Sequence, residues 1–347
     1  GRIIMRNNEW ATWPYISQRK PGWAEQAGDL EGLRGISPGR NVQLIPYALF
    51  SRARYLDNPA GGPPRLATEN EGRAGVDGKL VIKDAFTLDL TLNPDFSQVE
   101  SDEPQVTVNQ RYEVFFPEKR PFFLENAGYF ATPVRLFFSR RIVDPSFGAR
   151  LTGRLGRWAL GALLTDDRAP GHNAAASDPF HQAHTPVGVV RLQREFRQGG
   201  RTSTIGAMAT SRSFGDTYNR IFAVDTRWQA LRNWVFTGQA MTSNTRLANG
   251  QRLSGPGYYA SWRHYGRHFV STTSYTDFSP NFRSQLGFIR RVDIRQASQD
   301  LGYLWRPKTG PIQSIGPVFS YYSYHDHKGR MTDWNVSPEL RVTAIRG

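Results

Sequence analysis

The chain has 347 residues, contains no cysteine and carries a formal net charge of +14 from 44 basic and 30 acidic side chains. The absence of cysteine excludes disulfides, thiol catalysis and cysteine metal sites. No apolar run reaches about 18 residues, so we expect no transmembrane helix. The basic residues are scattered singly, whereas a nucleic-acid footprint needs a patch or a stripe. We therefore rank a soluble basic β-protein that binds nucleic acid below the two hypotheses given at the end of this subsection.

Residues 1–40 differ in composition from the rest of the chain. They are rich in Trp, Gly and Asn, and two short strand-like pieces precede a Ser-Pro-Gly turn at 37–39. The sequence begins with glycine and shows no apolar signal segment. We interpret these residues as the end of a preceding domain followed by a connector, and the chain as a fragment or a processed product.

From residue 41 onward the pattern is that of β-strands. Between 86 and 93, Phe and Leu alternate with Thr, Asp and Asn. The same period of two recurs at 150–155, 188–196, 222–230, 234–240 and 258–263. Such alternation gives each strand one apolar and one polar face. Together with 33 glycines and 13% aromatic residues, it predicts an all-β chain.

The connections between the expected strands alternate in length. The tight hairpin turns are expected at Gly156-Arg157, Gly199-Gly200, Arg232-Asn233 and Gly266-Arg267. The longer polar loops are expected at 166–186, 214–219, 244–256 and 278–285. This alternation is typical of an up-and-down membrane barrel. Candidates for its aromatic girdles are Trp158, Trp228, Trp234, Tyr258, Trp262, Tyr303 and Trp305.

The number of strands bears on closure of such a barrel. We expect about a dozen strands or more, and the last segment, 336–345, still has a strand pattern. A membrane barrel must close, because lipid cannot satisfy the backbone groups of an open edge. We therefore expect a partial barrel, with further strands missing from this chain.

The stretch 93–125 fits neither a helix period nor a strand period. It begins Asn-Pro-Asp-Phe-Ser-Gln-Val-Glu and ends Phe-Phe-Pro-Glu-Lys-Arg-Pro-Phe-Phe-Leu-Glu. A non-repetitive element with so many large side chains should pack against something. We predict an inward-folded, plug-like segment at 94–133, inside the β-structure.

The two motifs of this stretch, with Phe-Ser-Arg-Arg at 138–141 and Ala-Arg-Leu-Thr-Gly-Arg at 149–154, carry a resemblance. They are similar to the signature of a bacterial outer-membrane β-barrel family of unknown function, domain of unknown function 5916, whose members usually follow a domain like carbohydrate-binding module family 9. The resemblance implies that 1–40 are the C-terminal remnant of such a domain with its connector, and that 41–347 are a barrel fragment. It does not reach the sugar-binding body, so no residue is assigned to carbohydrate binding. The run around Val108 also departs from the family pattern, which usually has a leucine-type residue there.

The charged residues in and after this stretch allow three interpretations. Paired carboxylates can serve a glycoside hydrolase. Several carboxylates can gather around Ca²⁺, although the spacing matches no EF-hand loop. In the third interpretation, which we favour, they pair with lumen arginines and none is catalytic. The residues of this expected polar network are Asp95, Glu100, Asp102, Glu118, Arg120, Glu125, Arg140, Arg141, Arg150 and Arg154.

Histidines 172, 181 and 184 share one expected loop, and histidines 325 and 327 share another. His181 and His184 lie three residues apart, close to a metal-ligand spacing. Because neither a helix nor a carboxylate at fixed spacing accompanies them, we interpret them as solvated loop residues. We expect no metal and no cofactor. Nucleophile-elbow and phosphate-loop motifs are absent.

The sequence thus predicts an all-β, antiparallel up-and-down transmembrane β-barrel with a polar, arginine-rich lumen and an apolar face toward outer-membrane lipid. We expect a non-enzymatic role in transport, secretion or anchoring, together with a periplasmic carbohydrate-binding-like domain. The expected partners are carbohydrate or an anionic small solute, and no nucleic acid. The alternative is a carbohydrate-active enzyme, similar to O-glycosyl hydrolases, that uses the acidic cluster around Asp95–Glu125.

Overall fold

The computed structural model describes residues 2–4, 9–11, 32, 41–57, 63–94, 115–307, 309 and 311–344. A small antiparallel pair, β1 (Arg2–Ile4) with β2 (Glu9–Ala11), is separate from one large sheet of 14 strands. The strands of the large sheet are β3 (Val42–Asp57), β4 (Arg65–Ile82), β5 (Phe86–Leu92), β6 (Pro145–Leu155), β7 (Trp158–Asp167), β8 (Thr185–Gln198), β9 (Arg201–Phe214), β10 (Thr217–Leu231), β11 (Trp234–Arg246), β12 (Arg252–Tyr265), β13 (Phe269–Phe278), β14 (Ile294–Tyr303), β15 (Ile312–His325) and β16 (Met331–Ala344).

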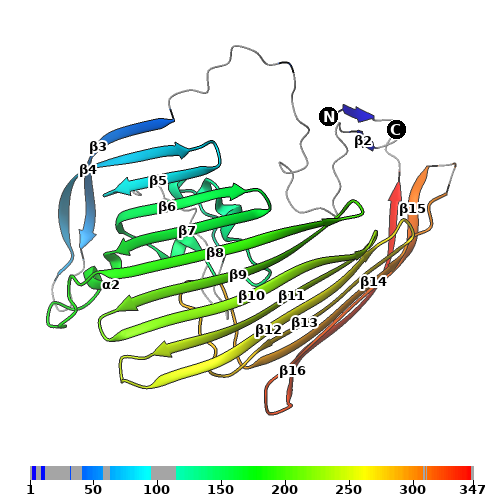
Figure 1. The fold of residues 1–347 in the computed structure, drawn as a ribbon. Helices are drawn as coiled ribbons and strands as arrows, with labels where there is room; N and C mark the ends of the chain where they lie inside the picture. Colours follow the sequence, from blue (N-terminus) through cyan, green and yellow to red (C-terminus); the bar gives the residue numbers. More distant parts are fainter. Residues whose placement is uncertain are drawn as a thin grey trace.

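All pairs in the large sheet are antiparallel, and the strands pair in chain order from β3 to β16 (Figure 1). This confirms the predicted all-β, antiparallel up-and-down architecture. In the described part of the chain, β3 and β16 are the two edges and do not pair with each other. The open sheet agrees with the predicted partial barrel, and its completion by further strands stays a prediction. None of the helices in the described segments is long and apolar enough to span a membrane.

The helices of the described residues are one-turn elements. They are α1 (Pro121–Leu124), η4 (Ala127–Phe130), η5 (Ser139–Arg141) and α2 (Ala169–His172). The sheet is curled, and the short helices between β5 and β6 lie on its inner side (Figure 1). Pro121 starts α1, where its missing N–H group removes no helical hydrogen bond.

The four predicted hairpin turns are confirmed by the strand ends, but two of the predicted long loops are wrong. Only Gly215 and Asp216 separate β9 from β10, and residues 247–251 connect β11 to β12. The polar residues near these turns belong to strands because they point into the interior. Asn219, for example, is buried and donates to the hydroxyl of Thr245 at 2.8 Å. Long connections remain at 168–184 and 279–293.

Side chains of β10 alternate between the two faces of the sheet. Phe222, Val224 and Trp228 are 54%, 45% and 53% exposed, whereas Asp225 and Gln229 are each 7% exposed. Exposed large apolar residues of the neighbouring strands include Leu90, Leu164, Val190, Leu192, Tyr258 and Trp262. The large apolar side chains Phe222, Val224 and Trp228 therefore point away from the interior and Asp225 and Gln229 point into it, as the alternation predicted, although Ile221 and Ala223 are also buried on the inner face.

Most of the predicted girdle residues lie beside the short turns. Trp158 begins β7, Trp234 begins β11, and Tyr303 ends β14. Trp234 also packs across strands against Trp262, with ring centroids 5.6 Å apart. Tyr258 differs, because it lies in the middle of β12 rather than beside a turn.

Two segments, 115–144 and 279–293, lie against the inner face and are joined to each other. Phe138 N–H donates to the carbonyl of Leu286 at 2.7 Å, and Phe288 N–H donates to the carbonyl of Arg135 at 3.0 Å. Their apolar residues pack on inward wall residues in one core cluster. Its members include Phe123, Phe130, Leu136, Ile142, Phe282 and Leu286 from the segments and Leu163, Val187, Val189, Met208, Ile221 and Met241 from the wall.

The predicted polar, arginine-rich lumen therefore describes only part of the interior. The wall residues beneath the two inner segments are covered by them and form an apolar core. On β8 the inward series changes from Val187 and Val189 to Arg191 and Glu195 toward the short turn. The interior is thus apolar under the segments and charged next to the turns.

Candidate functional site

Segment 115–144 contains a buried ion pair near its start. Glu118 accepts hydrogen bonds from Nε and Nη2 of Arg120, both at 2.8 Å, and from the hydroxyl of Ser139. Arg120 also donates to the carbonyls of Ile142 at 2.6 Å and Ser139 at 2.8 Å. The pair therefore joins the beginning of the segment to its end.

Burial of the Glu118 carboxyl raises its pKa, but the Arg120 guanidinium, the Ser139 hydroxyl and a backbone N–H outweigh this effect. Together they hold the pKa at about 2, below its ordinary value of 4.5. Because the folded-state pKa is depressed, the resulting stability is complete above about pH 4.5 and is lost as the pH falls toward about 2.

The variant Glu118→Gln should test this linkage. At neutral pH it should be less stable than the parent chain by an amount on the order of 3 kcal/mol, because a shift of one pKa unit corresponds to about 1.4 kcal/mol. Urea unfolding at a series of pH values should show this difference shrinking below about pH 4.5. Glu339→Gln, in an exposed pair with Arg341, is the control and should change little. A difference that stays constant down to pH 2 would contradict the assignment.

A second ion-pair group attaches the inner segment to the wall. Arg150 on β6 is 2% exposed and donates from Nη2 to the Asp89 carboxylate on β5 at 2.7 Å. Its Nη1 donates to the backbone carbonyls of Phe122 and Glu125 in the inner segment. The Glu125 carboxylate in turn pairs with Lys79 of β4. One guanidinium thus binds a wall carboxylate and two carbonyls of the segment.

The other arginines of the predicted network have separate partners. Arg140 donates to the carbonyl of Pro117 at 2.8 Å, and Arg141 donates to the carbonyl of Gly287 at 3.3 Å. Arg154 pairs with Glu195 on β8 at 2.8 Å. The structure therefore arranges the described members in local groups along the interior. Asp95, Glu100 and Asp102 lie outside the described residues.

These contacts bear on the hydrolase alternative. Glu118 pairs with Arg120, and Glu125 pairs with Lys79, so each of these two carboxylates is engaged by a cation. A retaining or inverting glycosidase instead needs two carboxyl groups that face each other across the substrate. The two described acids of the cluster do not favour that alternative.

Sequence reasoning missed the acidic partners on the strands. Arg191 on β8 donates from Nη2 to Asp225 on β10 at 2.8 Å and passes over Gly206 on β9. A Cβ atom at Gly206 would lie 2.5 Å from the guanidinium, so the glycine makes room for the pair. The alternation placed Asp89, Glu195 and Asp225 on polar faces, but strand register decides which arginine each one meets.

In the part of the chain that the structure describes, two large cavities border the stretch 131–134. The first, here called the aromatic cavity, has a volume of about 970 Å³. Its lining includes Phe115, Phe288, Tyr259, Tyr322, Tyr324, Arg135, Arg290, Arg291, Gln296 and Asp333. The second, the wall cavity, has a volume of about 660 Å³. Its lining includes Arg154, Arg157, Arg191, Gln193, Glu195, Asp225 and Arg227.

The cavities share Thr132 and Pro133 in their linings. Val134 N–H donates to the side-chain carbonyl of Gln239 on β11 at 2.6 Å, which fixes this short stretch to the wall. The stretch 131–134 therefore separates an arginine-rich space beside β7–β11 from an aromatic space beside β12–β16.

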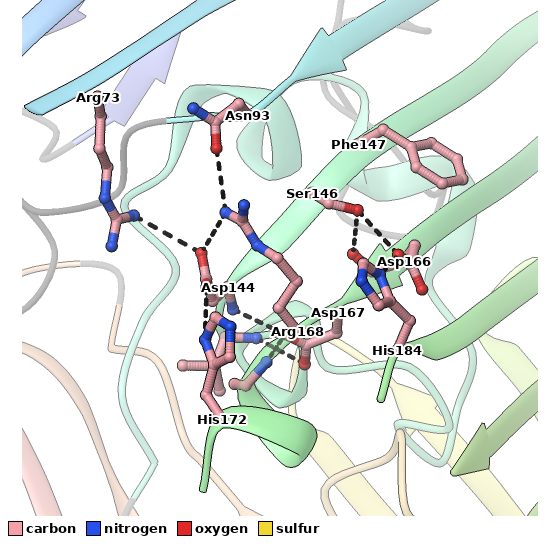
Figure 2. A network of polar contacts seen from close by, with 12 residues as sticks. Arg73, Asn93, Asp144, Ser146, Phe147, Asp166, Asp167, Arg168, His172 and His184 are labelled. Atoms are coloured by element: carbon pink, nitrogen blue, oxygen red, sulfur yellow. Dashed lines mark hydrogen bonds and ion pairs between the residues drawn. The ribbon is translucent and has the colours of Figure 1, made fainter. Parts of the chain in front are cut away.

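A polar network holds the loop 168–184 against the end of the inner segment (Figure 2). The buried carboxylate of Asp167 accepts from the backbone N–H groups of Val143, Asp144 and Ala169 at 3.1, 2.8 and 3.2 Å. Three such bonds satisfy a carboxylate that ends β7 inside the protein.

The Asp144 carboxylate extends this network to the first strands of the sheet (Figure 2). It contacts Arg168 at 2.9 Å, His172 at 3.5 Å and Arg73 of β4 at 3.6 Å. Arg168 also donates to the side-chain carbonyl of Asn93, which follows β5, at 3.1 Å. The loop after β7 is thus tied to β4 and to the end of β5.

The interpretation of the histidines as solvated is only partly right. Ring nitrogens of His327 lie 2.9 Å from Asp293 and 2.9 Å from Asp277, so it connects the loop 326–330 to β13 and to the second inner segment. His184 pairs with Asp166 and remains half exposed. Within the described ranges, no group of three or more potential metal ligands gathers in one place.

Comparison with known proteins supports part of the resemblance. Residues 38–151 match the family model described as Domain of unknown function (DUF5916). That stretch contains β3 to β5, the inner segment and most of β6. No curated protein matches the chain. The carbohydrate-binding-type domain and the assignment of 1–40 stay predictions.

Among solved structures, the outer membrane channel DcaP of Acinetobacter baumannii is 12% identical, with a TM-score of 0.36, and the match covers 89% of this chain and 99% of that chain. An anion-selective porin from Comamonas acidovorans is 10% identical, with a TM-score of 0.28 and coverages of 86% and 94%. The outer membrane protein OmpT of Vibrio cholerae is 9% identical, with a TM-score of 0.27 and coverages of 86% and 96%.

Proposed function

We propose that this chain forms the wall and the inward-folded segments of a non-enzymatic β-barrel in the bacterial outer membrane, where it passes anionic or polyhydroxylated solutes. One observation carries the proposal: the outer face exposes a row of large apolar side chains, whereas Arg150, Arg191 and Asp225 are buried on the inner face. In water such an apolar face would drive association, but in a bilayer it is the favoured surface. Anchoring or secretion would use the same outer face, but neither accounts for the cavities.

The interior supports the choice of solute. Arg154, Arg157, Arg191 and Arg227 line the wall cavity, against the carboxylates of Glu195 and Asp225. The aromatic cavity adds three arginines and one aspartate. A basic excess at the wall of a narrow space raises the local concentration of anions. The inner segments occupy part of the lumen, so we expect a small conductance.

The test is conductance of the full-length protein after reconstitution into planar lipid bilayers. A KCl gradient should give a reversal potential that shows anion preference, and a heat-denatured sample serves as the control. A cation preference, or the absence of any pore, would count against the proposal. Fractionation of cells that express the full-length protein should place it with outer membranes.

The outward face can be tested by one substitution. Val224→Arg lies in the middle of β10 and should destabilise insertion by about 2–4 kcal/mol, because it places a cation in the lipid core. Leu231→Arg ends the same strand beside the short turn and should cost about 0–1 kcal/mol. Urea unfolding from lipid vesicles measures both. Equal effects would mean that this face does not span a bilayer.

A further inference from the structure

We propose that the aromatic cavity is a binding site for aromatic carboxylates. The inference deepens the proposed function, because it assigns a solute class to one part of the lumen. It rests on three cation–ring pairs that face the same 970 Å³ space and on the charge balance around them. A cavity of this size is in the range of small-molecule sites.

The cations of the cavity lie over ring faces. The guanidinium of Arg135 is 4.5 Å from the ring centroid of Phe115, and that of Arg290 is 5.4 Å from the ring centroid of Phe288. A guanidinium held over a ring keeps its planar fork of N–H groups for a carboxylate, which it can bind through two hydrogen bonds. Stacking on a ring thus holds the guanidinium group in place and leaves its N–H groups available for hydrogen bonds.

The charge balance favours an anion. Arg291 is 5.7 Å from the ring centroid of Tyr324 and donates to the Asp333 carboxylate at 2.8 Å. Asp333 is the one carboxylate among the described lining residues, against three arginines. Neither Arg135 nor Arg290 forms an ion pair with a described carboxylate, so a bound carboxylate would find guanidinium groups in its reach.

The rings of the cavity favour an aromatic body over a sugar. Phe115 and Phe288 meet edge to face at 5.4 Å, and so do Tyr322 and Tyr324 at 5.7 Å. A further ring can extend such edge-to-face packing, which contributes beyond its buried area. Carboxylate and amide groups, which commonly bind sugar hydroxyls, are few here: among the described lining side chains only Asp333 and Gln296 offer them.

The cavity is placed where a solute can reach it. Most of the core beneath the inner segments lies on β7–β11, and Phe278 and Ile294 extend it to β13 and β14. The aromatic cavity lies beside the inner faces of β12–β16. There Tyr259, Thr276, Gln296, Tyr324 and Asp333 are successive cross-strand neighbours. The cavity is open rather than enclosed, so a solute in the lumen can reach this row.

The test is calorimetric titration of the refolded full-length protein in detergent, which does not require a conducting pore. Benzoate is the probe, glucuronate tests charge without an aromatic ring, and benzamide tests a ring without charge. Benzoate should bind, and the affinities of glucuronate and benzamide should be at least about tenfold lower. No benzoate binding, or equal binding of glucuronate or benzamide, would overturn the proposal.

Variants locate the site. Arg135→Gln combined with Arg290→Gln should weaken benzoate binding about tenfold, and both side chains are exposed, so the fold should be kept. Tyr322→Leu should weaken benzoate but not glucuronate. Arg227→Gln, in the wall cavity, is the matched control and should leave benzoate affinity unchanged. If Arg227→Gln alone weakens benzoate, the site lies elsewhere. An anion-selective pore without benzoate binding would overturn this inference and leave the proposed function standing.

Discussion

Replacing Arg150 by methionine should destabilise the protein by about 3–5 kcal/mol and release the inner segment from the wall. Methionine fills a similar space but leaves the Asp89 carboxylate, which is 5% exposed, without its main cation. Lys79 remains 3.6 Å from Asp89, too far for a hydrogen bond. The carbonyls of Phe122 and Glu125 lose their donor at the same time.

Two measurements should report this change together. Urea unfolding from vesicles gives the loss of stability, and the single-channel conductance should rise because the segment no longer lies fixed against β6. The double variant Asp89→Asn with Arg150→Met removes both charges and should recover much of the stability. Arg341→Met breaks an exposed pair with Glu339 and should change stability by less than about 1 kcal/mol. An Arg150→Met protein that behaves like Arg341→Met would refute the anchoring role.

The strand faces were predictable because a period of two needs no knowledge of partners. Asp89 and Arg150 were both assigned to polar faces on that ground. Their pairing was not predictable, because it depends on the register of β5 against β6, which are separated in the chain by the inner segment. The sequence therefore indicates which residues point inward before it can indicate which of them meet.

The apolar part of the interior was not predicted, because the alternation of apolar and polar residues disappears there. Around Val187 to Val190 both faces of β8 are apolar, so the alternation vanishes where lipid covers one face and the inner segments cover the other. The second inner segment, 279–293, has no period either. Phe282 and Leu286 are fully buried in it, yet in the sequence they read as loop residues among Ser, Pro, Asn and Gly.

Replacing Gly148 by valine should displace the inner segment by a steric route. Gly148 lies on the inner face of β6, and a Cβ atom there would lie 2.8 Å from the Phe122 ring and 2.9 Å from the Thr91 methyl group. The ring is rigid and is also held by Arg150, whose guanidinium lies 5.2 Å from its centroid. Overpacking of this kind costs about 1–3 kcal/mol. We expect that loss of stability together with an increase in conductance.

The matched control is Gly188→Val on β8, where nothing lies within 4 Å of the added Cβ atom. Valine suits a strand, so this variant should be neutral or slightly stabilising. A double variant, Phe122→Ala with Gly148→Val, separates crowding from a direct effect on the strand. If crowding is the cause, the valine should add little further loss once the ring is gone. If the valine is as harmful without the ring, or if Gly148→Val matches Gly188→Val, the ring does not rest on this glycine. Gly148 would then not help to position the inner segment, and the contacts of Arg150 would be left to hold that segment against β6.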